Sequence, residues 1–285
     1  MENLVISNPK KLKKLKKAIF KAGAEKFHVL SDFDRTLTYA FVDDENVPSL
    51  ISILRDGNYL VPGYAKKAHA LFNKYYPIEI NPKISLKEKK KAMREWWITH
   101  FELLIKSGLN KKDLKKVAKS KKIKFRKGVL EFIDFLHYHK IPLVIMSASG
   151  LGGDIISMYL ERENKLYKNI HIVANSFEWD EAGNAIDVKK PIIHGMNKDE
   201  TTIQKFPIFK IIKNRKNVLL LGDSLGDIGM IDGFEYDSLI KIGFLNGNVE
   251  NNIEYYKKNY DVIILNDSSM DYVNELLKEI IVLKQ

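Results

Sequence analysis

The sequence predicts an α/β protein with a parallel sheet between two layers of helices. Helical stretches such as VLEFIDFLHYH (129–139) separate several apolar runs, an alternation typical of a three-layer α/β/α fold. Six of these runs look like buried parallel strands: FHVLSDF (27–33), IPLVIMSA (141–148), IHIVANSF (170–177), NVLLLGD (217–223), LIKIGFL (239–245) and YDVIIL (260–265). Side chains with chemical roles are expected at the carboxyl ends of such strands.

A second structural unit is predicted between the first two of these strands. About a hundred residues separate them, far more than a crossover helix requires. Most of the excess has helical patterning, at 61–76, 85–108 and 110–122. We therefore predict a helical cap at 45–125, inserted into a core formed by 1–44 and 126–285.

Length and composition limit the class of protein. With 285 residues and 45% hydrophobic content, the chain can bury a sizeable core. No stretch approaches the roughly 18 apolar residues of a membrane span, and the N-terminus lacks an apolar signal region. We expect a cytoplasmic protein, monomeric or weakly oligomeric, without a membrane partner. The absence of cysteine excludes disulfides and thiolate catalysis, so any metal must use oxygen or imidazole ligands.

The net charge of +11 is concentrated in two segments. Residues 1–26 hold eight Lys against two Glu, and residues 83–127 hold seventeen Lys or Arg against four acidic residues. Such a basic lobe could bind nucleic acid or concentrate a small anionic substrate. For the lysines of KKLKKLKK (10–17) a solvated surface is favoured, because helical spacing over residues 10–20 places the apolar residues on one face and the lysines outside it. The apolar residues are Leu12, Leu15, Ile19 and Phe20. No nucleic-acid partner is expected.

Asp32 lies near the end of the first predicted strand and Asp34 directly after it, in the sequence DxDxT. On an extended backbone, two carboxylates two residues apart project to the same side. Because like charges resist ionising together, one can serve as a nucleophile and the other as a proton donor. The alternative is a surface turn in which Asp32 caps the following segment.

Two further segments suit a phosphate group. In PLVIMSASGLGGD (142–154) a strand ends at Ser147, and a glycine-rich turn precedes a helix whose N-terminus favours negative charge. In KKPIIHGMNKDE (189–200), Lys198 is a candidate positive charge for phosphate. The alternative for the first segment is an ordinary strand-to-helix connection. The alternative for Lys198 is a solvated surface lysine.

The last segment suits a metal ion. In NVLLLGDSLGDIGMIDG (217–233), Asp223 and Asp227 follow a strongly apolar strand. Carboxylate oxygens there suit Mg²⁺, which takes only a few ligands from protein. The alternative is helix capping by Asp223 or Ser224.

In this order the four segments resemble the motifs of the haloacid dehalogenase superfamily. A closer resemblance, from about residue 8 to the C-terminus, is to the cytosolic pyrimidine 5′-nucleotidases of type III. It covers the cap position as well as the core, and so bears on substrate class. The similar segments are SDFDRTLT (31–38), YYPIEINP (75–82), MREWW (93–97), IMSA (145–148), IHGMNKDE (193–200) and LLLGDSLGDIGMIDG (219–233).

The resemblance implies a Mg²⁺-dependent 5′-nucleotidase, a phosphoric monoester hydrolase. Asp32 would attack phosphorus and form an aspartyl-phosphate, and Asp34 would serve as general acid and then general base. Phosphate oxygens would be held by Ser147 and the amide of Ala148, and Lys198 would neutralise charge. The metal set implied is Asp32, the backbone carbonyl of Asp34, and Asp223, with Asp227 orienting the metal's waters or Lys198.

The cap is expected to select the nucleoside. Glu79 matches an acidic residue of the family that contacts the nucleoside, and His100 falls where a serine contact is expected in the animal enzymes. The aromatic residues Trp96, Trp97 and Phe101 suit either a stacking face or the cap core, which their helical spacing favours. The phosphate turn SASGLGGD (147–154) is longer than is usual in the family but keeps Ser147. We therefore expect altered selectivity with the chemistry retained.

The resemblance implies pyrimidine nucleotides, UMP and CMP, as the expected substrates, and deoxynucleotides and 7-methyl-GMP stay open. Three alternatives remain: a phosphatase of the phosphoserine type, phosphotransfer to a second nucleoside, and a nucleic-acid-binding protein that uses the basic lobe.

Overall fold

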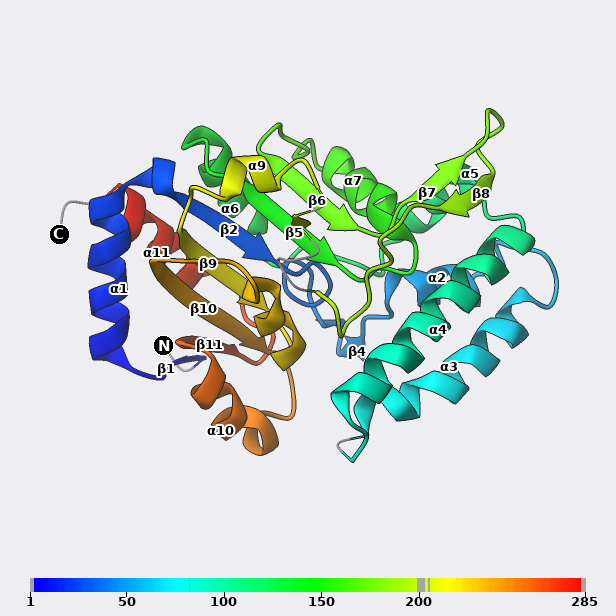
Figure 1. Ribbon diagram of the computed structural model, residues 1–285, viewed down its shortest axis with the longest axis horizontal. Helices are drawn as coiled ribbons and strands as arrows, with labels where there is room; N and C mark the ends of the chain where they lie inside the picture. The colour runs from blue at the N-terminus through cyan, green and yellow to red at the C-terminus, as the bar shows by residue number, and fades with distance from the viewer. Residues whose placement is uncertain (1–2, 82, 199–202, 205, 283–285) are drawn as a thin grey trace.

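The computed structural model describes residues 3–81, 83–198, 203–204 and 206–282. At its centre lies a seven-stranded sheet in the order β1-β11-β10-β9-β2-β5-β6 (Figure 1). Its strands are β1 (Leu4–Ile6), β2 (Phe27–Ser31), β5 (Leu143–Ser147), β6 (Ile170–Ala174), β9 (Asn217–Gly222), β10 (Ser238–Leu245) and β11 (Val262–Leu265). Neighbours are parallel except β1, which pairs antiparallel with β11. All six predicted strands are present, and β1 is an additional edge strand.

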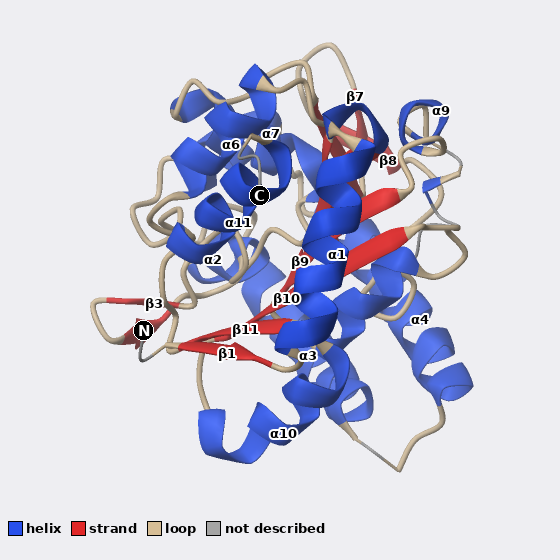
Figure 2. Ribbon diagram, turned by 90° about the vertical axis from the view of Figure 1, so that its left-hand side faces the viewer, coloured by secondary structure: helices blue, strands red, loops and turns tan. Residues whose placement is uncertain are grey.

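Helices cover both faces of this sheet. They are α1 (Pro9–Ala22), α6 (Val129–Tyr138), α7 (Gly152–Arg162), α9 (Phe209–Ile212), α10 (Val249–Asn259) and α11 (Asp271–Ile281). Because side chains alternate along a strand, Leu219 and Leu221 pack in a core with α1, α6, α7 and α11, whereas Val218 and Leu220 pack with α9 and α10. Figure 2 shows α6, α7 and α11 on one side of the strands and α9 on the other. The predicted three-layer α/β architecture is confirmed.

The segment between β2 and β5 is mostly helical. It contains α2 (Leu50–Asp56), α3 (Tyr64–Ile80), α4 (Leu86–Lys106) and α5 (Lys111–Ala118). The last three correspond to the predicted helices, and α2 was not predicted. In Figure 1, α3 and α4 lie side by side and away from the sheet. The division into core and cap at 45–125 stays a prediction.

The start of the predicted cap at 45–125 differs from the all-helical expectation, because residues 45–46 belong to a strand. Two short strands, β3 (Phe41–Val42) and β4 (Glu45–Asn46), form a hairpin. At its tip, Asp43 and Asp44 have positive φ angles of 53° and 63°, a conformation that Asp tolerates in tight turns. Strands of two residues are too short for an alternating pattern, so they carry no periodic signal in the sequence.

The two connections that flank the helical segment run side by side. Thr38 and Phe125 form an antiparallel bridge. The N–H of Tyr39 donates to the Lys124 carbonyl at 3.0 Å, and the N–H of Arg126 donates to the Leu37 carbonyl at 2.9 Å. The chain therefore leaves and re-enters the sheet region at one place, a few residues beyond Asp32.

The lysine-rich N-terminal helix packs as its pattern predicts. The Asn8 side chain caps α1 by accepting a hydrogen bond from the Lys11 N–H at 2.9 Å. Leu12 and Ile19 are buried in the main core, and Lys16 pairs with Glu279 on α11. Among the described residues, no helix is long and apolar enough to cross a membrane.

Candidate active site

The four sequence motifs meet at one edge of the sheet. Strand β2 lies between β5 and β9, so its carboxyl end, followed by Asp32, lies beside the ends of both neighbours. Ser147 ends β5, and Asp223 directly follows β9. The N–H of Asp32 donates to the carbonyl of Leu221 at 3.0 Å, which fastens the DxDxT turn to β9.

Three carboxylates form the centre of this site. One oxygen each of Asp32, Asp223 and Asp227 lies within 4.8 Å of the others. Burial raises the pKa of Asp32 to about 7 against the opposing effect of Lys198, and burial raises the pKa of Asp223 well above its usual range. These groups therefore need a nearby cation to remain ionised. An all-oxygen donor set of this kind fits a hard divalent cation.

Lys198 supplies one positive charge to the cluster. Its ammonium group donates hydrogen bonds to Asp32 and, at 3.1 Å, to Asp227. Burial alone would favour the neutral amine, but the Asp227 and Asp32 carboxylates outweigh it and raise the pKa of Lys198. The lysine is thus a fixed charge beside the nucleophile candidate. Asp199 and Glu200, which end the same sequence motif, lie outside the described residues.

Asp227 connects Lys198 to the loop that carries Asp223. Its Oδ2 accepts hydrogen bonds from the N–H of Asp223 at 3.2 Å, and from the N–H and hydroxyl of Ser224 at 2.9 and 2.8 Å. A Cβ on Gly222 would lie 2.5 Å from the Cβ of Asp227, so this close approach requires glycine. Asp227 and Ser224 also cap the 3₁₀ turn η2 (Leu225–Ile231). Asp227 therefore both caps this turn and belongs to the carboxylate cluster.

The turn after Asp32 is held by a residue that the sequence did not single out. Asp34 is partly buried there, and burial raises its pKa despite Lys198 and Arg35. Arg126 is 1% exposed and donates to the carbonyls of Thr36 at 3.0 Å and Arg35 at 2.8 Å. Nothing in the local sequence distinguishes this arginine from its many basic neighbours.

The phosphate turn and the Lys198 segment share a second unpredicted residue. Ser147 is buried, Ala148 is partly exposed after it, and the Ser147 hydroxyl accepts from the Ser149 N–H at 3.1 Å. Asn175 donates to the carbonyls of Ser149 at 3.3 Å and Ile193 at 2.8 Å, and accepts from the Ile193 N–H. Its signal in the sequence is a lone amide that ends an apolar strand.

Glu79 and His100 lie beside the loops of the site. A Cβ on Gly195 would lie 3.4 Å from Glu79 Oε1, and a Cβ on Gly150 would lie 3.3 Å from His100 Nε2. Burial raises the pKa of Glu79 and lowers the pKa of His100 to about 4. His100 Nε2 has no hydrogen-bond partner among the residues that the structure describes, and the charge of Lys89 opposes the rise in the pKa of the partly buried Glu79.

The aromatic residues of α4 separate into two groups. Trp96 is buried against Tyr75, with rings stacked at 5.8 Å, and against Met93. Phe101 is 2% exposed in the main core. Both therefore have the packing role that their spacing favours. Trp97 is partly buried, and its buried Nε1 has no hydrogen-bond partner in the described part of the chain.

Comparisons with known proteins identify the family. Residues 35–281 match the family described as pyrimidine 5′-nucleotidase (UMPH-1). The chain is 34% identical over 277 residues to a 7-methylguanosine phosphate-specific 5′-nucleotidase of Gallus gallus, covering 97% of this chain and 95% of the relative. The chain belongs to the pyrimidine 5′-nucleotidase (UMPH-1) family. It is therefore a 5′-nucleotidase, and the expectation drawn from the sequence motifs is confirmed.

Solved structures agree with this assignment. Cytosolic 5′-nucleotidase IIIB bound to cytidine superposes with a TM-score of 0.89 at 28% identity, covering 98% of this chain and 94% of that one. A substrate-bound phosphoserine phosphatase superposes with a TM-score of 0.51 at 16% identity, which shows the fold alone. The haloacid dehalogenase fold predicted for this pyrimidine 5′-nucleotidase family member is thus confirmed.

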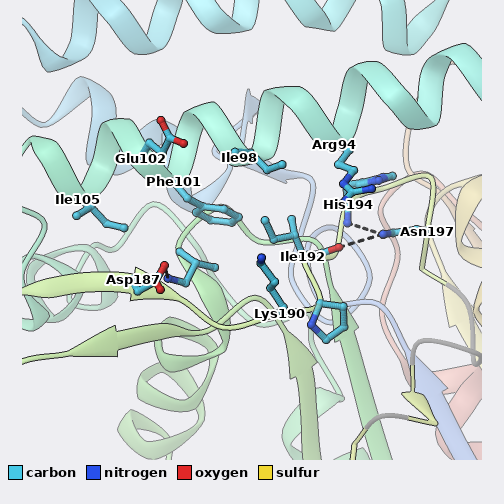
Figure 3. Close-up of a pocket in the computed structure, with 12 residues that line it drawn as sticks. Arg94, Ile98, Phe101, Glu102, Ile105, Asp187, Lys190, Ile192, His194 and Asn197 are labelled. Carbon is cyan, nitrogen blue, oxygen red and sulfur yellow. Dashed lines mark hydrogen bonds between the residues drawn. The ribbon is translucent and has the colours of Figure 1, made fainter.

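This 5′-nucleotidase also has a cavity of about 670 Å³ between α4 and the segment 187–197 (Figure 3). Arg94 and His194 lie at one end of it, and Glu102 and Asp187 at the other. Of the residues considered for catalysis or substrate binding, Phe101, a candidate for the stacking face, lines this cavity, whereas Asp32, Lys198, Glu79 and His100 do not. It lies against the same chain segment that carries Lys198.

Proposed function

We propose that this protein hydrolyses nucleoside 5′-monophosphates to nucleoside and phosphate through an aspartyl-phosphate on Asp32, with Mg²⁺ as cofactor. The observation that carries the proposal is the meeting of Asp32, Asp223, Asp227 and Lys198 at the ends of adjacent strands. A 5′-nucleotidase that works in this way needs a nucleophile, a phosphate-binding cation and a metal site in one place, and this cluster offers a candidate for each.

In the first step, a carboxylate oxygen of Asp32 attacks phosphorus while the bond from phosphorus to the nucleoside 5′-oxygen breaks. Asp34 donates its proton to that oxygen. The raised pKa of Asp34 supports this role, because a buried carboxyl group keeps its proton at a higher pH than an exposed one. Lys198 neutralises charge that develops on the transferred group.

In the second step, the Asp34 carboxylate removes a proton from water, and the oxygen of that water attacks phosphorus. The bond from phosphorus to Asp32 breaks, which releases phosphate and restores the carboxylate. Ser147 and the N–H of Ala148, at the end of β5, bind phosphate oxygens in both steps.

Asp32, the backbone carbonyl of Asp34, and Asp223 would hold Mg²⁺, with Asp227 orienting the surrounding groups. The bound cation reduces the repulsion between the carboxylate nucleophile and the phosphate. The raised pKa values of Asp32 and Asp223 support a cation here, since burial otherwise disfavours their charged forms.

Glu79, His100 and Trp97 supply the nucleoside contacts in this proposal. His100 Nε2 and Trp97 Nε1 are buried without a hydrogen-bond partner among the described residues, whereas buried polar groups are usually hydrogen-bonded. The Glu79 carboxylate is partly buried, and burial raises its pKa against the charge of Lys89. Pyrimidine monophosphates, UMP and CMP, are the first candidate substrates, which the family description and the cytidine-bound relative support. The second candidate is 7-methylguanosine monophosphate, favoured by the names of the relatives.

The remaining proposals concern the cellular location and the alternative activities. A cytoplasmic location agrees with relatives named cytosolic. A phosphoserine substrate, phosphotransfer to a nucleoside, and binding of nucleic acid by the basic lobe stay as alternatives that activity can separate.

A phosphate-release screen tests the proposal. Purified protein is assayed with UMP, CMP, 7-methyl-GMP and phosphoserine, each with Mg²⁺ and with EDTA. We expect turnover of nucleotides that requires Mg²⁺, and a phosphorylated Asp32 after rapid quenching with acid. A clear preference for phosphoserine would refute the nucleotide assignment. Tight, salt-dependent oligonucleotide binding without any turnover would favour the nucleic-acid alternative.

A further inference from the structure

Two buried tyrosines hold the loop that follows β9. Tyr256, in the last turns of α10, donates its hydroxyl to the carbonyl of Asp223 at 2.5 Å. Tyr260, directly after α10, donates to the carbonyl of Ser224, also at 2.5 Å. The side chains of Tyr256 and Tyr260 are buried, and their rings stack at 5.3 Å. Two consecutive carbonyls of the Asp223 loop are thus fixed from one side.

The amide side of the same loop is fixed by Asp227. As described above, its Oδ2 accepts from the N–H groups of Asp223 and Ser224. Both hydrogen-bonding groups of each of these two residues are therefore occupied, the donors by an aspartate and the acceptors by tyrosines. A backbone held at four points leaves the Asp223 carboxylate little freedom beyond its own side-chain rotations.

The strand beside the tyrosines is adapted to this arrangement. A Cβ on Gly243 of β10 would lie 2.6 Å from the ring of Tyr260, so only glycine lets the ring pass. The hydroxyl of Ser7 donates to the Tyr260 carbonyl at 2.7 Å and holds its backbone in place. The two hydroxyls therefore reach the loop from a rigid support.

We infer that Tyr256 and Tyr260 are positioning residues that fix the Asp223 loop for binding the divalent cation. The inference rests on the proposed function, because it takes Asp223 as a ligand of that cation. Groups that orient metal ligands typically change metal affinity about 10- to 100-fold when they are removed. Loss of one hydroxyl leaves the second in place, so a single variant is expected at the lower end.

The test uses Tyr256→Phe and Tyr260→Phe, which remove one hydroxyl each and keep the ring. Tyr255→Phe is the matched control, since Tyr255 lies next in the same helix with its side chain 63% exposed. Binding of Mn²⁺ is measured directly by calorimetry, and amide hydrogen exchange of residues 222–228 is measured in metal-free protein. Neither readout depends on turnover.

We expect the Kd for Mn²⁺ to rise about tenfold in each Phe variant and to be unchanged in the control. Exchange in 222–228 should accelerate in the same two variants, while the KM for nucleotide at saturating metal stays within about twofold. The inference is overturned if wild-type turnover requires the cation but both variants match the control in Kd and exchange. Wild-type turnover that is independent of any divalent cation would instead overturn the proposed function, and the inference with it.

Discussion

Among the described residues, polar groups are hydrogen-bonded to one another at the end of the sheet, but not on the helical side of the site, where α3 and α4 carry Glu79 and His100. At the sheet end, Lys198 donates hydrogen bonds to Asp32 and Asp227. Asp227 in turn accepts a hydrogen bond from the N–H of Ser224, in the loop that follows β9. On the helical side, His100 Nε2 is buried without a hydrogen-bond partner among the described residues, and Glu79 is partly buried with the charge of Lys89 nearby. Since burying an unpaired polar group costs free energy, the first region is organised before substrate arrives. Under the proposed function, the polar groups of the second region gain partners when the nucleoside binds.

The largest expected effect is at the nucleophile. Asp32→Asn keeps the shape of the side chain but removes the attacking charge, so kcat should fall on the order of 10⁴-fold or more. Steady-state phosphate release from CMP measures it, with the exposed Asp237→Asn as a control that keeps full activity. Full turnover by the Asp32→Asn variant would remove Asp32 from the chemical step.

Loss of the fixed lysine should have a smaller effect. Lys198→Gln removes the charge that faces the transferred phosphoryl group but leaves the nucleophile, so kcat should fall about 10²- to 10³-fold. The exposed Lys189→Gln is the control. An activity within about threefold of wild type would mean that Lys198 stabilises the buried carboxylates in the folded protein but does not stabilise the transition state.

On the helical side, the effect should depend on the substrate. Glu79→Gln keeps the size of the side chain and weakens its acceptor, so kcat/KM for nucleotides should fall roughly 30- to 150-fold, the loss of about 2–3 kcal/mol expected for a charged hydrogen bond. Turnover of p-nitrophenyl phosphate, which has no nucleoside, should be unchanged.

Glu102→Gln is the control for this prediction, because Glu102 lies on α4 in the cavity of Figure 3. An equal loss with both substrates in the Glu79 variant would place Glu79 in the chemistry and remove the distinction between the two regions. A similar loss in the Glu102 variant would mean that the nucleoside occupies that cavity.

The sequence predicts the two regions unequally well. Asp32, Ser147 and Asp223 were found because each follows an apolar run, and parallel strands bring such positions to one edge of the sheet. Lys198 has no local signal of this kind and needed the family resemblance. Arg126 could not be found, because its role depends on carbonyl groups about 90 residues earlier in the chain.

The contacts that α3 and α4 make with the loops of the site also could not be predicted from the sequence. Helical spacing predicted packing for Trp96 and Phe101 correctly, but it could not show which polar atoms face the loops around Gly150 and Gly195. That information comes from the way α3 and α4 are placed against these loops. It is a property of tertiary packing and not of any local pattern.

The smallest expected effect tests whether His100 is held neutral without substrate. Burial lowers its folded-state pKa to about 4, whereas an unfolded histidine titrates near 6.5. Between these values the unfolded chain binds the proton and the folded one does not, so the free energy of unfolding falls as the pH falls. His100→Leu removes this group, while every other titrating group remains in both proteins.

The measurement is urea unfolding of wild type and His100→Leu from pH 7.5 to 4.5, without nucleotide. Relative to the variant, the wild type should lose about 2 kcal/mol of unfolding free energy over this range, and nothing above pH 7.5. A difference that stays constant with pH would mean that His100 accepts its proton in the folded state, through water or a carboxylate. The helical side would then already satisfy its polar groups as the sheet end does, and the contrast between the two regions would be lost.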